Sequence, residues 1–131
     1  MKPTNNNYNI LIVDNSSMIV ERLCGLLREL GNVKAVSKAY SYEEALETLS
    51  AGNFDLVLLD TQLQDKSGFE LLAYIKSNFP EVKTIMFTNQ TSCFYQEKGE
   101  RIGTDHFIDK SSEFEKVIEI IQDYSPGYEL N

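Results

Sequence analysis

Cysteine and histidine are scarce in this sequence, and their scarcity argues against two classes of protein. The only cysteines, Cys24 and Cys93, form no CxxC pair and no cluster with a histidine. We therefore expect two reduced thiols in a cytoplasmic protein rather than a disulfide-stapled secreted domain. His106 is the single histidine and cannot build a histidine-rich metal centre, so a structural role is the simpler interpretation.

Basic residues are also few relative to acidic ones. The chain has 12 Lys and Arg against 20 Asp and Glu, a formal net charge of −8 and a pI near 4.6. Because phosphate groups would be repelled, we expect no nucleic-acid partner and no anionic membrane, whereas metal cations and basic protein surfaces fit. For the charge taken alone, the simplest interpretation is that it keeps the protein soluble.

Long apolar runs are absent. No window approaches the ~18 apolar residues of a membrane span, and the opening MKPTNNNYN lacks the apolar core of a signal peptide. At 131 residues the chain has room for one domain, with an expected core over 8–124 and loose termini at 1–7 and 125–131. We expect no output domain after the last helix.

Strand and helix patterns alternate five times along the chain. The apolar run Leu56–Leu59 lies between Asp55 and Asp60, which is typical of a strand buried on both faces of a parallel sheet. Strands are predicted over Tyr8–Val13, Val33–Ala39, Asp55–Leu59, Val82–Phe87 and Asp105–Asp109. Helices are predicted from Ser16 to about Leu30, Ser41 to Gly52, Phe69 to about Asn78, Thr91 to Lys98, and Phe114 to Tyr124.

Polar residues and glycines indicate where these helices begin and end. Asn15 or Ser16 is expected to cap the first helix, with Gly31 in the left-handed position after it. Gly99 and Gly103 are expected to interrupt the fourth. The spacings of Ser41 with Glu44 and of Ser112 with Glu115 predict two capping boxes.

The order of elements predicts the fold. Right-handed crossovers between alternating strands and helices give an α/β protein with a five-stranded parallel sheet, flavodoxin-like and doubly wound, most simply in the order 2-1-3-4-5. All strands then end at one edge of the sheet, where ligands bind in this class of fold.

Five polar residues stand at the carboxyl ends of the predicted strands. They are Asp14, Asn15, Asp60, Thr88 and Lys110. Crowded carboxylates repel one another unless a cation offsets them, and hard oxygen ligands suit Mg²⁺. A cation, a lysine ammonium, a hydroxyl and a carboxylate nucleophile are also what phosphoryl transfer requires, so Asp60 is the candidate nucleophile.

On these residues, together with Gly68 eight positions after Asp60, the chain resembles the receiver domain of two-component response regulators. The resemblance implies that Asp60 accepts a phosphoryl group from a histidine kinase or phosphotransfer protein, with Thr88 and Lys110 binding the phosphoryl oxygens. The Mg²⁺ ligands that it implies are Asp14, Asn15, Asp60 and the carbonyl of Gln62.

The same resemblance implies a route for the signal. Thr88 and the aromatic residue Phe107 would relay phosphorylation to a downstream protein bound at the face of the fourth helix, fifth strand and fifth helix. Phe94 and Tyr95 would lie on or near that face.

The chain departs from the usual receiver pattern at four positions. Asn15 replaces a second carboxylate, which predicts weaker Mg²⁺ binding because an amide carries no charge. Gln64 and Ser111 stand where proline is usual, so we expect a less rigid loop at Gln64 and a trans bond before Ser111. Asn89 is larger than the usual small residue after the threonine, and would screen or crowd an acyl phosphate.

Simpler roles and other functions stay open. Asp60 could cap a turn, Asn15 a helix, and Phe107 could be an ordinary core residue. The alternative function is a pseudo-receiver, an interaction module without phosphorylation. A phosphatase of the haloacid-dehalogenase type would need an aspartate where Gln62 stands, and a flavin site would need a phosphate loop after the first strand.

Overall fold

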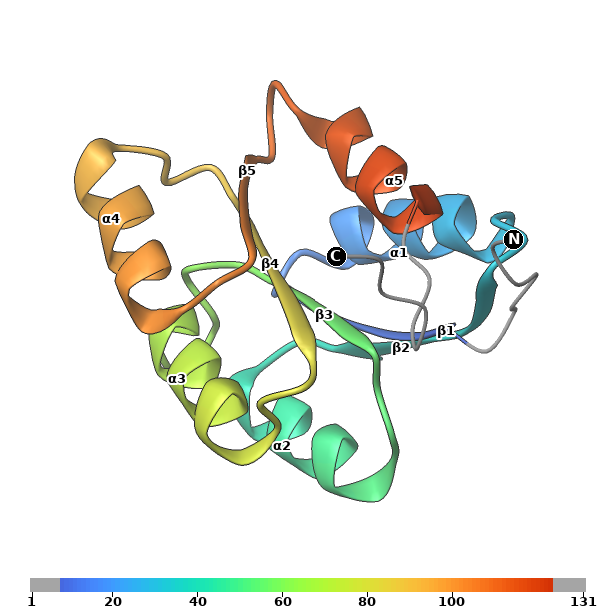
Figure 1. The fold of residues 1–131 in the computed structure, drawn as a ribbon, viewed down its shortest axis with the longest axis horizontal. Coiled ribbons are helices and arrows are strands. Elements are labelled where there is room, and N and C mark those ends of the chain that lie inside the picture. The colour runs from blue at the N-terminus through green and yellow to red at the C-terminus, as the bar shows by residue number, and fades with distance from the viewer. Residues whose placement is uncertain (1–7, 124–131) are drawn as a thin grey trace.

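The computed structural model describes residues 8–123 and contains one sheet of five parallel strands. The strands are β1 (Tyr8–Val13), β2 (Val33–Ala39), β3 (Leu56–Leu59), β4 (Lys83–Thr88) and β5 (His106–Asp109), in the order β2-β1-β3-β4-β5. Figure 1 shows the twisted sheet crossing the middle of the molecule. The predicted α/β fold and strand order are confirmed, while the prediction of loose termini falls outside the described residues.

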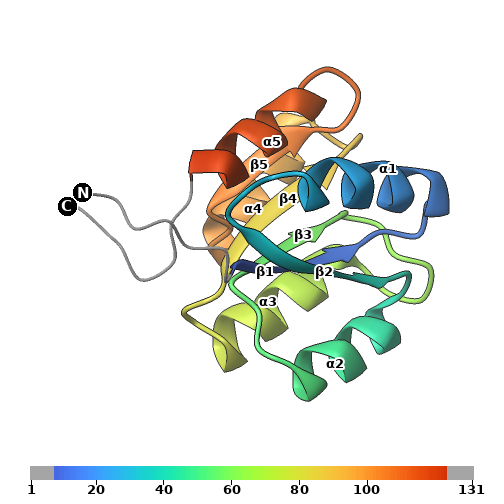
Figure 2. The same cartoon turned by 90° about the vertical axis from the view of Figure 1, so that its right-hand side faces the viewer.

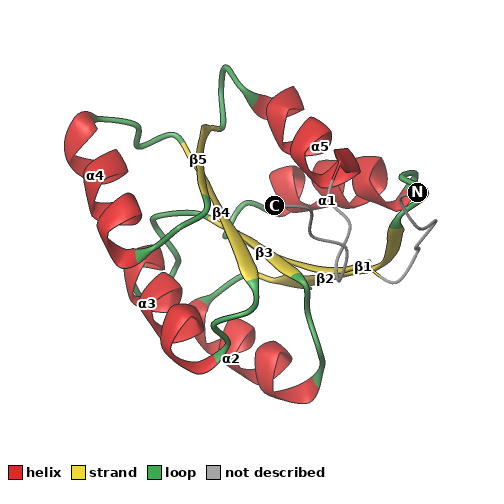
Figure 3. Cartoon of the chain, viewed as in Figure 1, coloured by secondary structure: helices red, strands yellow, loops and turns green. Residues whose placement is uncertain are grey.

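Five helices cover the two faces of this sheet. They are α1 (Ser17–Arg28), α2 (Tyr42–Ala51), α3 (Gly68–Asn78), α4 (Cys93–Ile102) and α5 (Phe114–Asp123). Helices α1 and α5 lie on one face, and α2, α3 and α4 on the other (Figures 1 and 2). The strands form the central layer of three (Figure 3). None of the helices between residues 8 and 123 combines the length and apolar composition needed to cross a bilayer.

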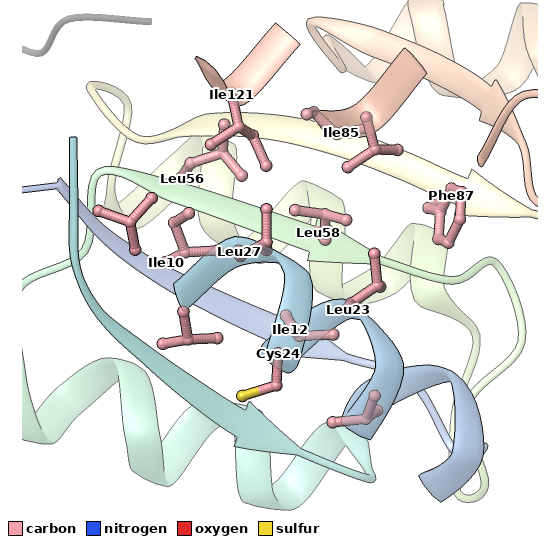
Figure 4. Packing of buried hydrophobic residues seen from close by; sticks show 14 of the residues in the cluster. Ile10, Ile12, Leu23, Cys24, Leu27, Leu56, Leu58, Ile85, Phe87 and Ile121 are labelled. Carbon is pink, nitrogen blue, oxygen red and sulfur yellow. The ribbon is translucent and has the colours of Figure 1, made fainter. Parts of the chain in front are cut away.

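Alternating side chains on the central strands build a separate apolar core on each face. Ile10 and Ile12 of β1, with Leu58 of β3, pack against Leu23 and Leu27 of α1 (Figure 4). Their neighbours along the strands belong to the opposite core, with α2 and α3. Because β3 is buried on both faces, its charged neighbour Asp60 can emerge only at the sheet edge.

Two predictions about glycines are wrong. Helix α1 ends at Arg28 with Glu29 as its C-cap, and Gly103 is the one residue with positive φ, +121°, among residues 8–123, so Gly31 is not in the left-handed region. Gly99 does not interrupt α4 but lies buried inside it. A Cβ on Gly99 would come within 3.1 Å of the Phe107 ring, so the missing side chain admits that ring.

The predicted helix starts are partly confirmed. Of the two candidates for the α1 cap, the Ser16 hydroxyl accepts from the Ile19 amide at 3.4 Å. The Ser41 hydroxyl accepts from the Glu44 amide at 3.1 Å, but the Glu44 carboxylate accepts from Tyr40 rather than from Ser41.

The predicted capping box before α5 does not form. In the segment between β5 and α5, the carboxylate of Glu113 instead accepts from the Asp109 amide at 3.0 Å.

The two cysteines are free thiols in different environments. Cys24 belongs to α1 and is buried in the core under that helix, whereas Cys93 is exposed at the start of α4. This agrees with the prediction that they form no disulfide.

Candidate functional site

Three charged side chains from three strand ends meet at the carboxyl edge of the sheet. The ammonium of Lys110 donates to Asp14 Oδ2 at 2.6 Å and to Asp60 Oδ2 at 2.9 Å. The exposed fractions of these side chains are only 9%, 3% and 13%, respectively. The predicted convergence of residues that are up to 96 positions apart is therefore present in the structure.

The strand order explains why they meet. Asp14 follows β1, Asp60 follows the neighbouring β3, and Lys110 follows β5. Backbone hydrogen bonds extend the ladder past the strand ends, from Asp60 N to Val13 O at 3.2 Å and from Lys110 N to Thr88 O at 2.8 Å. The long lysine side chain then crosses over β4, with its ammonium 5.9 Å from the centre of the Phe87 ring.

Burial and mutual contact shift the pKa values of Asp14 and Lys110. Burial raises the pKa of Asp14 above its ordinary value, and the hydrogen bond and charge of Lys110 only partly oppose this. Burial by itself would lower the pKa of Lys110, but the hydrogen bonds that its ammonium donates to Asp14 and Asp60 outweigh this effect, so the pKa of Lys110 is raised. The ammonium is thus the counterion for two carboxylates, which together with it retain one negative charge.

Thr88 reaches Asp60 through a residue that the sequence reasoning missed. The fully buried Thr88 hydroxyl lies 2.8 Å from the hydroxyl of Thr61. Thr61 contacts Asp60 Oδ1 twice, by its amide at 2.6 Å and by its hydroxyl at 3.4 Å. Thr61 follows the end of β3, and no local pattern in the sequence marks it, because its role depends on lying opposite Thr88.

The other two candidate metal ligands lie beside this cluster and are more exposed. Asn15 and Gln62 line an open hollow of about 730 Å³ between the β3–α3 loop and the start of α4. Phe94, 67% exposed, and Tyr95 form part of the same hollow. The Tyr95 ring stacks on Phe69 of α3 with centroids 5.9 Å apart, so it is held in place while Phe94 is presented to solvent.

Gly68 is required by a close approach of two backbone segments. Its amide donates to Thr61 O at 2.7 Å, and a Cβ placed on it would lie 1.7 Å from the carbonyl oxygen of Asp60. No side chain fits there without moving the backbone of the candidate nucleophile. The β3–α3 loop is also closed on itself by pairing of Gln62 with Ser67.

Asp65 fastens the same loop to α2. Its carboxylate accepts from the amides of Tyr42 at 2.8 Å and Glu43 at 3.1 Å, which are unpaired donors at the helix start. These hydrogen bonds from backbone amides hold the pKa of Asp65 below its ordinary value, and the one from Tyr42 has the largest effect. The loop that follows Asp60 therefore has an anchor 22 or more positions away in sequence.

We expect Asp65→Ala to lower the urea midpoint of unfolding at pH 7, and Glu81→Ala, which removes an exposed carboxylate elsewhere, to leave it nearly unchanged. Because the folded-state pKa of Asp65 is depressed, its contribution is present above the ordinary value of about 3.9 and is lost as the pH falls through the folded value. The midpoints of wild type and Asp65→Ala should converge in acid. Equal midpoints for the two variants at pH 7 would contradict the anchor.

Phe107 and Ser111 lie on the β5 side of the cluster. The Phe107 ring is half-buried against Gly99 of α4 and belongs to the core on that face. No cis peptide occurs between residues 8 and 123, so the expected trans bond before Ser111 is confirmed.

The donor set fits Mg²⁺ in kind. Asp14 and Asp60 provide carboxylate oxygens, and Asn15 and Gln62 provide neutral ones, which are the ligand types that this ion takes. Residues 8–123 contain no cluster of three or more His, Cys, Asp or Glu side chains suited to a metal. A metal at this edge would therefore depend on two carboxylates supplemented by amide oxygens.

Comparison with known proteins agrees with this site. A family model for the response regulator receiver domain matches residues 10–122. The transcriptional regulatory protein CitT of Bacillus subtilis is 30% identical over 105 residues, 80% of this chain and 46% of that protein. The Fimbriae Z protein of Salmonella typhimurium is 27% identical over 128 residues, 98% of this chain and 59% of that protein. The chain thus spans about half the length of these curated relatives.

Solved receiver structures share the fold. A CheY-like receiver domain protein from Methanospirillum hungatei JF-1 superposes with a TM-score of 0.80 at 30% identity, covering 88% of this chain and 90% of that one. The response regulator TrrA of Thermotoga maritima, in complex with Mg(2+)-BeF, has a TM-score of 0.76 at 30% identity, covering 88% and 97%. Together with the matched family model, these likenesses show that the chain belongs to the response regulator receiver domain family of two-component signalling.

Proposed function

We propose that this receiver is a phosphoacceptor, phosphorylated on Asp60 by a histidine kinase or phosphotransfer protein. The observation that carries the proposal is the bridging of Asp14 and Asp60 by Lys110 at 2.6 and 2.9 Å. This contact places a nucleophilic carboxylate, an acidic neighbour and a cation in one nearly buried cluster. Such a cluster is suited to charge that shifts between a carboxylate and a phosphoryl group.

In the proposed reaction, a carboxylate oxygen of Asp60 forms a bond to the phosphorus of a phosphohistidine. The phosphorus–nitrogen bond breaks, its electron pair stays on the imidazole, and the product on this chain is an acyl phosphate. Lys110 exchanges its contact with Asp60 for one with a phosphoryl oxygen, and the Thr88 hydroxyl donates to another.

The proposed Mg²⁺ ligands are Asp14, Asn15, Asp60 and the backbone carbonyl of Gln62. Bound there, the ion would supply positive charge to offset that of the phosphoryl oxygens. This chain's own part is to hold the acidic residues apart from bulk water and to keep Lys110 within reach of both. The similar receiver TrrA, solved in complex with Mg(2+)-BeF, supports the proposal that this fold binds Mg²⁺.

For the output of the signal, we propose the surface of α4, β5 and α5, with Thr88 and Phe107 as the switch residues. Phe107 lies against Gly99 of α4, so a change in its position bears directly on that helix. The exposed ring of Phe94 on α4 supports a protein partner at this end of the surface.

Asn15 favours a second candidate, a pseudo-receiver that binds partners without phosphorylation. To decide, the protein is treated with Mg²⁺ and acetyl phosphate and its intact mass is measured, with Asp60→Ala as the control. An added phosphoryl group on wild type and none on Asp60→Ala is expected. No added group on wild type, with equal partner binding by both proteins, would favour the pseudo-receiver.

We expect Asn15→Asp to tighten Mg²⁺ binding severalfold, because a third carboxylate adds negative charge beside the cluster. The measurement is a Mg²⁺ titration by calorimetry at fixed ionic strength. Asn53→Asp, which adds the same charge at an exposed position before β3, is the matched control and should leave the affinity nearly unchanged. Unchanged affinity in Asn15→Asp would show that this side chain does not ligate the metal.

A further inference from the structure

A row of hydrogen bonds connects Asp60 with the loop that precedes α4. The Gln90 amide donates to Thr88 Oγ1 at 3.0 Å. The hydroxyls of Thr88 and Thr61 lie 2.8 Å apart, and the Thr61 hydroxyl lies 3.4 Å from Asp60 Oδ1. Both threonine side chains are buried, with 0% and 2% of their surface exposed, so water does not replace a contact that is lost.

The protons in this row have one arrangement in which each finds an acceptor. Thr88 Oγ1 already accepts from the Gln90 amide, and a carboxylate can only accept. The Thr88 proton must therefore point to Thr61, and the Thr61 proton to Asp60. In the reverse arrangement Thr61 would donate to Thr88, and the Thr88 proton would have no acceptor among these groups.

We propose that Thr61 is a positioning residue that holds the Thr88 hydroxyl in its resting orientation while Asp60 is a free carboxylate. The inference rests on the proposed function, because it concerns what changes when Asp60 is phosphorylated. Formation of the acyl phosphate removes the charge of the carboxylate group and weakens it as an acceptor. The Thr61 hydroxyl then loses its partner, and Thr88 is released to donate to a phosphoryl oxygen.

The contact between the two threonines stabilises the resting state and not the phosphoryl-bound state. Thr61→Val keeps the shape of the side chain but removes the acceptor, which leaves the buried Thr88 proton unsatisfied at rest. The cost falls on the resting state alone, so the equilibrium shifts towards the phosphoryl-bound orientation. Thr61→Ser retains the hydroxyl and is the matched control.

The first measurement is binding of the phosphoryl mimic beryllofluoride at fixed, saturating Mg²⁺. Loss of one buried hydrogen bond from the resting state predicts about fivefold tighter binding by Thr61→Val. Thr61→Ser should bind as wild type does. Unchanged or weaker binding by Thr61→Val would overturn the proposal. Should valine at this position prevent folding, Thr61→Ala serves as the same test.

The second measurement needs no phosphorylation. The amide signal of Gln90 is followed by NMR when Asp60→Asn removes the carboxylate charge. We expect a clear shift in the wild-type and Thr61→Ser backgrounds and at least a threefold smaller one with Thr61→Val. A Gln90 amide signal that does not shift on Asp60→Asn in any background would contradict the coupling between Asp60 and Gln90. Absence of beryllofluoride binding by wild type would count against the proposed function, and the NMR result would then decide the role of Thr61.

Discussion

Replacing Lys110 with methionine is expected to lower the free energy of unfolding at pH 7 by about 3–5 kcal/mol, the range for removing one partner from a buried charge cluster. Lys110 is the ammonium that contacts both Asp14 and Asp60, at 2.6 and 2.9 Å. Without it two nearly buried carboxylates face each other unpaired. Methionine preserves most of the side-chain volume, so the loss reports the charge rather than a cavity.

The pH dependence of this loss distinguishes electrostatics from packing. Burial raises the folded-state pKa of Asp14 above its ordinary value, so its ionisation costs stability, and this cost is absent below the unfolded value of about 3.9. In Lys110→Met the cost is larger, so the difference in unfolding free energy between wild type and variant should decrease in acid.

The pKa of Lys110 is also raised, so the stability that the lysine contributes is present below about 10.4 and is lost as the pH rises through the folded-state pKa. The difference in unfolding free energy between wild type and Lys110→Met should therefore decrease again in strong alkali.

Urea unfolding at a series of pH values measures both effects. Lys116→Met, which removes an exposed lysine paired with Glu113, is the control and should hardly change the urea midpoint. Adding Asp14→Asn to Lys110→Met should recover part of the lost stability, because it removes one unpaired charge. A pH-independent loss in Lys110→Met would show that the lysine acts through packing alone.

Gly68→Ala is expected to cost about 3 kcal/mol of unfolding free energy, at the upper end for overpacking because the clash is with backbone. The added Cβ would lie 1.7 Å from Asp60 O and within 2.9 Å of Thr61 Cα. Relief requires the β3–α3 loop to move, and with it the carboxylate of Asp60. We therefore expect phosphoryl uptake from acetyl phosphate to fall at least tenfold.

Gly25→Ala is the matched control for Gly68→Ala. Gly25 lies inside α1, and a Cβ there has no neighbour within 4 Å. Alanine at this helical position should raise stability by up to about 1 kcal/mol and leave phosphoryl uptake unchanged. A Gly68→Ala protein as stable and as readily phosphorylated as wild type would contradict the close approach described for Gly68.

The sheet could be predicted from the sequence because the patterns that indicate its strands and helices each lie within a short stretch of the chain. The run Leu56–Leu59 and the alternation of strand and helix patterns indicate a parallel sheet with right-handed crossovers, for which 2-1-3-4-5 is the simplest order. The same order brings Asp14, Asp60 and Lys110 to one edge. The assignment of phosphoryl-transfer roles to these residues remains a prediction that the experiments above address.

The features that the sequence did not predict depend on contacts between distant segments. Gly99 was expected to break α4 because glycine disfavours helices, yet the ring of Phe107, from β5, occupies the space it leaves. Asp65 gave no local sign that it caps α2. Thr61 has no distinguishing pattern in the sequence, and its role depends on lying opposite Thr88, 27 positions away.

The contrast between the two cysteines has a practical consequence. Cys24 is shielded in the core, whereas Cys93 is exposed at the first turn of α4. A maleimide dye should therefore attach to Cys93 alone in the native protein without any substitution. Its fluorescence would report, in real time, any rearrangement of this turn beside Phe94 when a phosphodonor is added.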